Sequence, residues 1–297
     1  MAEMREQTDV ADARVRHEQR QEQLRQSRGT APLVAVAERF VEIDGTTLGG
    51  LLSVQLFTTV IPLIIIGFAH FSGFAKNANV GDLFIRDLGL HHPLDDRVRE
   101  AFGSASGVQS AWTFFGAAAF LVWGIPMSVM VAAMFARAWR RQPFGTLARL
   151  VRGAAWFTLY LGTMFAHERI SFGGQHGAGV RAALLVVGLV PLWIFWSLTP
   201  VLLVRDGGRE WRHVLLAGFA GVVVQGIVLS GVIRVGFPMV LEGWAGFGPI
   251  GVAMTLMTWC GVLAFGWVVI ACASAVIWER NAPADVVVES QTTGVPR

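Results

Sequence analysis

The sequence predicts an all-α integral membrane protein with six transmembrane helices. The mean hydropathy of the 297-residue chain is +0.53 and 15% of its residues are charged, whereas a soluble domain has about 25%. A soluble chain of this length could not bury so much apolar surface in one core. Apolar segments also recur along the chain, and most of them approach the roughly 20 residues that a helix needs to cross a bilayer.

The N-terminal region divides into a polar tail and an amphipathic helix. Residues 1–30 are rich in Glu, Gln and Arg, which predicts a solvated tail without the apolar region of a signal peptide. A partner-binding helix is the alternative for this tail, although it would lack an apolar stripe. In residues 33–44, apolar side chains recur at helical spacing from Leu33 to Val41, which predicts an interfacial helix that leads into the first span. The charged side chains of this helix are expected on its opposite face: Glu38, Arg39 and Glu42.

The first three predicted spans cover residues 45–71, 111–136 and 150–167. Hydroxyl side chains and Gln55 give the first span a polar face, which is expected to point into the bundle rather than toward lipid. The third span is short, because its uncharged part, residues 153–166, would be only about 21 Å long against a hydrocarbon core of about 30 Å. Its charged ends therefore either snorkel to the headgroups or are shielded by protein.

The last three predicted spans cover residues 182–204, 214–240 and 248–277, and residues 281–297 form a C-terminal tail. In the loop between the first two spans, residues 72–110, short amphipathic stretches predict two interfacial helices. Prolines in the second and fourth spans predict kinks, either structural or hinge-like. Glycines along the fifth span predict close helix packing or, alternatively, bending during transport. The prolines are Pro126, Pro191 and Pro200, and the glycines are Gly218, Gly221, Gly226, Gly231 and Gly236.

Six spans place both termini on the same side of the membrane. Most of the basic residues lie on that side, and the short connection 137–152 contains five arginines and no acidic residue. By the positive-inside rule, the N- and C-termini are therefore expected in the cytoplasm. Tryptophans near the predicted span ends suit interfacial anchoring; they are Trp112, Trp139, Trp211, Trp244 and Trp278.

Four stretches of the chain share the order and spacing of a known family. They read ERFVEIDGTTLGGLLSVQLFTTVIPL, AMFARAWRRQPFG, LLVRDGGREWRHVLLAGFAG and FGPIGVAMTLMTWCGVLAFGWVV. In these stretches the chain resembles the YihY/BrkB-like bacterial inner-membrane proteins, once labelled ribonuclease BN, as a distant member. The resemblance implies a multi-pass protein of the bacterial inner membrane, with lipid or envelope-related transport and serum resistance among the roles linked to the family. The matching positions are Pro62, Trp139, Arg205, Trp211, Arg212, Gly218, Gly248 and Trp259.

The chain also departs from the family pattern at three places. The last span has Ala271–Cys272–Ala273–Ser274 where the family often has a Gly-Ala-Glu-like triplet, Phe247 replaces a tyrosine, and Gln225 stands where an aromatic residue is common. These departures lie in the last third of the chain, which also contains most of the resemblance.

No sequence pattern in the chain predicts catalysis. A ribonuclease would need a metal-binding acid/His cluster or a His pair with access to RNA. The best cluster runs from His91 to Asp96, on the side opposite the termini, and we interpret it as polar surface with an Asp helix start, a metal site being the alternative. No zinc-ligand set or cofactor motif is present, and a net charge of +3 is too small to indicate a nucleic-acid partner. We therefore predict no enzyme, no metal and no cofactor, with membrane lipids as partners; the sequence does not predict an oligomeric state.

Polar residues inside the spans are the candidate functional residues, because burying them in lipid is costly. Gln55 and Gln225 either form interhelical hydrogen bonds or line a polar cavity. Arg234 either snorkels outward or serves as a counter-ion for an anionic lipid. His167, Glu168 and Arg169 form an outer rim or, alternatively, a charged site drawn inward by the short third span.

Two hypotheses for function follow from these candidates. The first is a non-enzymatic membrane protein that moves a lipid-like or amphipathic solute. The second is an envelope structural or assembly factor without transport. Convergence of Gln55, Gln225 and Arg234 on one water-accessible cavity would favour the first.

Overall fold

The computed structural model describes residues 31–71, 85, 92, 94–97, 111–171, 178–208 and 211–282, and within these residues the regular structure is entirely helical. This confirms the predicted all-α class. The principal helices are α2 (Ala31–Glu42), α3 (Gly45–Phe71), α6 (Ala111–Ala138), α7 (Thr146–Ser171), α8 (Ala178–Leu203), α9 (Trp211–Gly221), the π-helical segment η2 (Val222–Leu229), α10 (Ser230–Trp244), the 3₁₀ turn η3 (Ala245–Phe247) and α11 (Pro249–Asn281).

Among the described residues, three helical segments are long and apolar enough to cross a membrane: Val186–Leu203, Trp211–Trp244 and Ile250–Asn281. The second of these is the continuous run of α9, η2 and α10. Such segments fit a membrane protein. The other three predicted spans fall on α3, α6 and α7, which have 27, 28 and 26 residues, but the count of six crossings stays a prediction.

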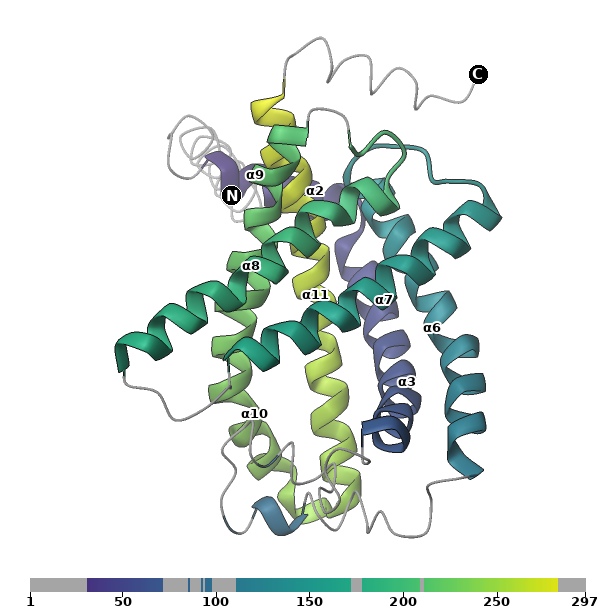
Figure 1. The fold of residues 1–297 in the computed structure, drawn as a ribbon, viewed down its shortest axis with the longest axis vertical. Helices are drawn as coiled ribbons and strands as arrows, with labels where there is room; N and C mark the ends of the chain where they lie inside the picture. Colours follow the sequence, from purple (N-terminus) through teal and green to yellow (C-terminus); the bar gives the residue numbers. More distant parts are fainter. Residues whose placement is uncertain are drawn as a thin grey trace, which may run out of the picture.

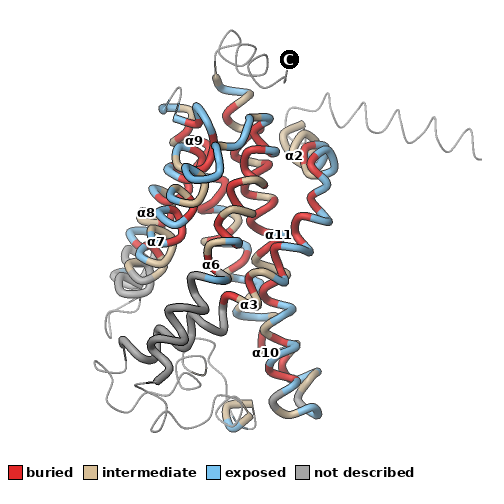
Figure 2. The backbone as a smooth tube through the Cα atoms, turned by 90° about the vertical axis from the view of Figure 1, so that its right-hand side faces the viewer, coloured by how far each residue is buried: buried red, intermediate tan, exposed pale blue. Residues whose placement is uncertain are grey.

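The bundle is built around α11. Figure 1 shows α11 through the middle, with α3 and α6 on one side, α9 and α10 on the other, and α7 and α8 crossing it obliquely. Helix α11 packs against α3, α9, α2, α10 and α6, and buried positions are frequent along it (Figure 2). Its N-terminus follows Gly248, whose φ of 57° favours glycine, and Pro249 begins the helix. The C-terminal end of α11 and helix α2 lie at the same end of the bundle (Figure 1).

Helix α7 is longer than the predicted span 150–167, and two of its arginines, Arg149 and Arg152, find hydrogen-bond acceptors near its start. Arg149 donates to the backbone oxygen of Phe144 at 2.9 and 3.2 Å. Arg152 donates to the carbonyl oxygens of Val201 and Leu202, at 3.4 and 3.3 Å. Those carbonyls belong to the last turn of α8, where a helix attracts cations. The arginines are thus accommodated inside α7 instead of ending it.

Helices α8 and α9 approach each other closely through small residues. A Cβ atom on Gly221 would lie 2.0 Å from Trp196 Cγ, and one on Gly218 would lie 2.0 Å from Ser197 Oγ. By contrast, a Cβ on Gly231 would meet nothing within 4 Å. The indole of Trp193 also donates to the backbone oxygen of Leu215 at 2.9 Å. Close packing therefore accounts for Gly218 and Gly221 but not for Gly231.

Helix α2 differs from the predicted amphipathic pattern. Leu33 and Val41 are exposed, at 71% and 77%, whereas Arg39 is only 4% exposed. The prediction that Arg39 lies on an exposed charged face was therefore wrong. The reason is that acceptors and acidic groups from α6 and α11 surround its guanidinium, as described below.

Candidate functional site

Gln225 lies in a π-helical segment in the middle of the long helix that spans Trp211–Trp244. The backbone oxygen of Gln225 accepts a hydrogen bond from Ser230 Oγ at 3.0 Å, five residues on. Short π-helical segments are rare and occur often at functional sites. The Gln225 side chain is 8% exposed. Its Nε2 donates to Tyr160 Oη at 3.3 Å and lies 3.5 Å from Met164 Sδ, both on α7.

A chain of side-chain contacts leads from Gln225 through three other helices and back to the helix that carries Gln225. Tyr160 packs edge-on against Trp267 of α11, with ring centroids 5.1 Å apart. The centroids of Trp267 and Trp196 are 6.4 Å apart. Trp196 in turn lies against Gly221, which is about one helical turn before Gln225. We call these five residues, from α7, α11, α8 and α9–η2, the aromatic–amide ring.

A second layer of aromatic side chains holds the ring in place. Trp156 stacks on Tyr160, with centroids 5.8 Å apart and planes 12° from parallel. Its indole donates to Thr199 Oγ1 at 3.0 Å, and Thr199 Oγ1 donates to the backbone oxygen of Phe195 at 2.9 Å. Both Trp156 and Thr199 are fully buried. This indole is therefore satisfied inside the protein.

Three polar atoms of the ring have hydrogen-bonding capacity that the protein does not use. Gln225 Oε1, Trp196 Nε1 and Trp267 Nε1 are buried and have no hydrogen-bond partner within the described part of the chain. The two tryptophans are each 1% exposed. A buried polar group without a partner costs about 1–3 kcal/mol. One acceptor and two donors of the ring are thus left unused by the described part of the chain.

A second cluster joins α2 to α6 and α11, and we call it the α2 ion-pair cluster. Arg39 Nη2 donates to Glu279 Oε2 at 2.6 Å, and its Nη1 donates to the backbone oxygen of Ala138. Arg140 binds Glu42 through two hydrogen bonds of 2.8 and 2.6 Å. These hydrogen bonds, with the nearby charge of Arg39, hold the pKa of Glu42 below its usual value. Glu42 raises the pKa of Arg140 in return.

Tryptophans extend this contact between α6 and α11. The rings of Trp139 and Trp278 lie 5.5 Å apart, and the Arg141 guanidinium lies 5.4 Å from the Trp278 ring. Trp139 Nε1 donates to Ser274 Oγ at 3.3 Å. Ser274 belongs to the segment in which the chain departs from the YihY/BrkB-like pattern. In the structure Ser274 is buried and accepts the hydrogen bond from the Trp139 indole.

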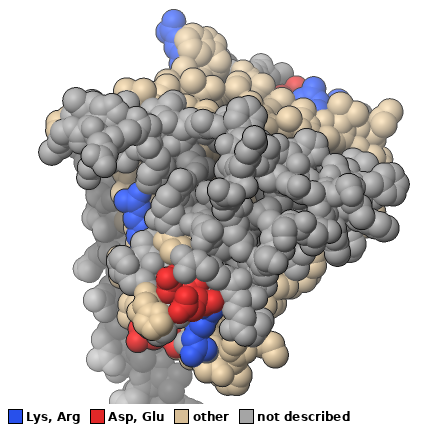
Figure 3. Space-filling view, turned by 60° about the horizontal axis from the view of Figure 1, so that its bottom comes forward, with Lys and Arg blue, Asp and Glu red and all other residues tan. Residues whose placement is uncertain are grey.

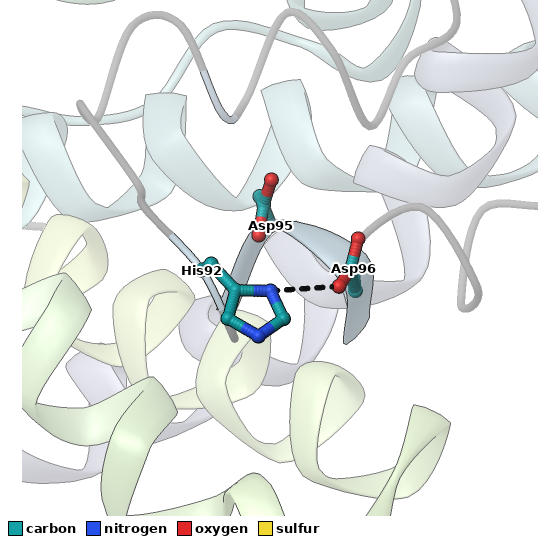
Figure 4. Close-up of side chains that lie close together, drawn as sticks. All are labelled: His92, Asp95 and Asp96. Atoms are coloured by element: carbon teal, nitrogen blue, oxygen red, sulfur yellow. Dashed lines mark hydrogen bonds and ion pairs between the residues drawn. The ribbon is translucent and has the colours of Figure 1, made fainter.

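His92 lies close to Asp95 and Asp96, which belong to a helical turn at residues 94–97, so the acid/His stretch identified in the sequence forms a cluster (Figure 4). His92 Nδ1 is 3.0 Å from Asp96 Oδ2, and one ligand atom from each residue lies within 4.8 Å of the others. The side chains of His92 and Asp96 are 81% and 61% exposed. Figure 3, which brings this end forward, shows acidic side chains directly beside basic ones. Exposed acidic groups cluster in this way without a metal, so the geometry alone assigns no ion.

The predicted intramembrane residues lie in different environments. Gln225 is buried in the aromatic–amide ring, whereas Arg234 is exposed on α10. Gln55 is half-buried on α3, and its backbone oxygen accepts hydrogen bonds from Thr58 and Thr59 at 3.0 and 2.7 Å. Gln225 and Arg234 therefore do not share one environment. The backbone of His167, Glu168 and Arg169 lies in the last turns of α7, and their side chains fall outside the described residues, as does that of Pro62 on α3.

The other residues on which the predicted family resemblance rests lie in several different structural environments. Trp139 is buried in the α2 ion-pair cluster, Gly218 contacts Ser197, and Gly248 precedes α11. Trp259 stacks on Phe237 with centroids 5.9 Å apart. Arg205, Trp211 and Arg212 are exposed, and the Arg212 guanidinium lies 5.8 Å from the Trp211 ring.

Sequence reasoning identified Gln225 but missed the rest of the ring. Tyr160 is the only tyrosine in the chain. Its rarity is the one feature of the sequence that could have identified it as a candidate. Trp196 and Trp267 lie in the middle of long apolar runs, where tryptophan is less expected than at the interfaces.

Comparisons with known proteins add no further assignment. No protein-family model matches the chain, and no curated protein or solved structure is significantly similar to it. The resemblance to the YihY/BrkB-like inner-membrane proteins therefore stays a prediction from the sequence.

Proposed function

We propose that this protein is a non-enzymatic membrane protein of the YihY/BrkB-like type that binds and moves a lipid-like or amphipathic solute. The observation that supports this proposal is the unused hydrogen-bonding capacity of Gln225, Trp196 and Trp267 inside the bundle. Polar groups within a membrane are costly and are kept where they serve a pathway or a ligand. Apolar and aromatic walls with a few convergent polar groups are also typical of ligand sites.

The surroundings of the ring suit movement as well as binding. Gln225 lies in a π-helical segment, and such segments are places where long helices bend and are frequent at functional sites. The ring joins the α7–α8 hairpin to α11 and to the long Trp211–Trp244 helix. We place the protein in the bacterial inner membrane, with six crossings and both termini in the cytoplasm, on the arginine-rich connection 137–152.

A liposome assay tests the proposal directly. The full-length protein is reconstituted, and the transbilayer movement of acyl-labelled lipids is followed for anionic, zwitterionic and uncharged glycosyl headgroups. We expect wild-type protein to accelerate at least one lipid about tenfold or more over protein-free liposomes. Gln225→Leu should lose most of this acceleration. Ile227→Leu is the matched control, because Ile227 lies in the same π segment but is 58% exposed.

The second candidate, a structural or assembly factor, is favoured by the close packing at Gly221 and by the α2 ion-pair cluster, which both fix helices to one another. Under this alternative, wild-type protein would move no lipid of the series faster than empty liposomes. That result would overturn the proposal of transport.

A further inference from the structure

We infer that the aromatic–amide ring selects a solute whose polar part is uncharged and both donates and accepts hydrogen bonds, such as a sugar hydroxyl, an alcohol or an amide. This inference rests on the proposed function, because it takes the ring as the solute site. It names the chemical class that the ring can satisfy.

The first argument is the complement of donors and acceptors. Gln225 Oε1 is an acceptor and requires a donor, whereas the indole N–H groups of Trp196 and Trp267 are donors only and require an acceptor. A hydroxyl or a primary amide supplies both. A phosphate diester or a carboxylate supplies acceptors alone, which leaves Gln225 Oε1 unsatisfied. An ammonium group supplies donors alone, which leaves both indoles unsatisfied.

The second argument is charge. Among the described side chains, Met164, Trp156, Phe195 and Phe135 contact the ring, and all four are uncharged. A charge that enters such surroundings loses its hydration without gaining an ionic partner, which costs several kcal/mol. An uncharged headgroup avoids this cost.

A cation held over an indole face is the strongest rival, since tryptophan is the best aromatic partner for cations. The contacts of the ring disfavour it. Trp156 and Tyr160 both meet Trp267 in edge-to-face geometry, at 88° and 79°, and Phe195 meets Trp196 at 72°. Aromatic neighbours thus already surround both indoles, and a cation would still offer no acceptor to their N–H groups.

The ring also has an adaptable side. Gln225 and the neighbouring Met164 are long, flexible side chains 3.5 Å apart, whereas the other four members of the ring are aromatic residues or glycine. Methionine reshapes easily around a neighbouring group. A solute can therefore displace Met164 and reach the amide without movement of the tryptophans.

The test compares three amphiphiles with the same brominated alkyl chain: a glucoside, a phosphate and a trimethylammonium. Bromine quenches tryptophan fluorescence, and the full-length protein is held in zwitterionic nanodiscs. We expect the glucoside to bind at least tenfold more tightly than either charged amphiphile. Gln225→Leu should weaken glucoside binding about tenfold and bring the preference close to one, because Gln225 Oε1 is lost. If this variant does not fold, Gln225→Met keeps the side-chain volume and is used in its place.

Trp259→Phe is the control, since Trp259 also has a buried indole N–H without a partner in the described chain but lies in a separate cluster with Phe237. It should keep the preference of the wild type. Equal or tighter binding of a charged amphiphile would overturn the inference, and so would equal preferences in the Gln225 and Trp259 variants. Selective glucoside binding without lipid movement would contradict the proposed transport alone, whereas movement that prefers charged lipids would contradict the inference alone.

Discussion

One hydrogen bond inside the bundle joins the amide of Gln225 to the hydroxyl of Tyr160 on α7. Tyr160 and Gln225 are 65 positions apart in the chain, and their side chains meet at 3.3 Å. The amide nitrogen of Gln225 is satisfied by this contact, whereas its oxygen has no partner among the residues that the structure describes. The stability of the ring should therefore depend strongly on the tyrosine hydroxyl.

Tyr160→Phe is expected to lower the free energy of unfolding by about 1–3 kcal/mol, because it leaves the buried Gln225 amide without its acceptor. Thermal unfolding in one detergent measures the change. Thr158→Ala, at an exposed position on the same helix, should stay within about 0.5 kcal/mol of the wild type. A tyrosine variant as stable as the threonine control would show that the hydrogen bond is absent. Because the chain has one tyrosine, tyrosine resonance Raman bands also report this contact, and they should shift in Gln225→Leu.

At the scale of the elements, two glycines of the same long helix differ in their surroundings, and only one of them contributes to helix packing. Gly221 lies against the fully buried Trp196, whereas Gly231 faces open space. Gly221→Ala should destabilise the bundle by about 1–3 kcal/mol, since the indole has no room to move. Gly231→Ala should be neutral or stabilise by up to about 1 kcal/mol, because alanine favours a helix. The measurement is the unfolding midpoint of both variants, and equal midpoints would contradict the close approach of α8 and α9.

The helices also show how much of the fold can be predicted from one sequence. The helix α3 coincides with the predicted span 45–71, because its 27 residues are mostly apolar and include no Asp, Glu, Lys or Arg. Helix α7 exceeds its predicted span at both ends. The carbonyl oxygens that accept from its Arg152 belong to α8, about 50 residues away, and no local pattern indicates this contact. Arg39 was placed on the wrong face for the same reason. Its acidic partner Glu279 lies at the far end of the chain, and no local pattern indicates such a pair.

The candidate site was predictable only in part. Gln225 was found from its polarity within an apolar run. Its neighbours Tyr160, Trp196 and Trp267 come from three other helices, and tertiary packing alone brings them together. The sequence left open whether Gln225 and Arg234 converge on one cavity, and in the structure Gln225 is buried whereas Arg234 is exposed.

At the scale of the whole molecule, orientation can be tested with reporter fusions at Arg141 and Gly174. Six crossings place these positions on opposite sides of the membrane, with Arg141 in the cytoplasm. A cytoplasmic reporter should be active at Arg141 and inactive at Gly174, and a periplasmic reporter should show the reverse. Equal activity at the two positions would exclude the six-span topology.

The ion pair between Arg39 and Glu279 connects positions 240 residues apart. At about 5–20 residues per second of synthesis, Glu279 leaves the ribosome tens of seconds after Arg39 does. Among the acidic groups that contact Arg39, only Glu42, 3.3 Å away on the same helix, exists during that interval. The bridge from α2 to α11 therefore forms only on chains completed through α11, and a truncated chain would lack this connection between its N-terminal helix and the central helix of the bundle.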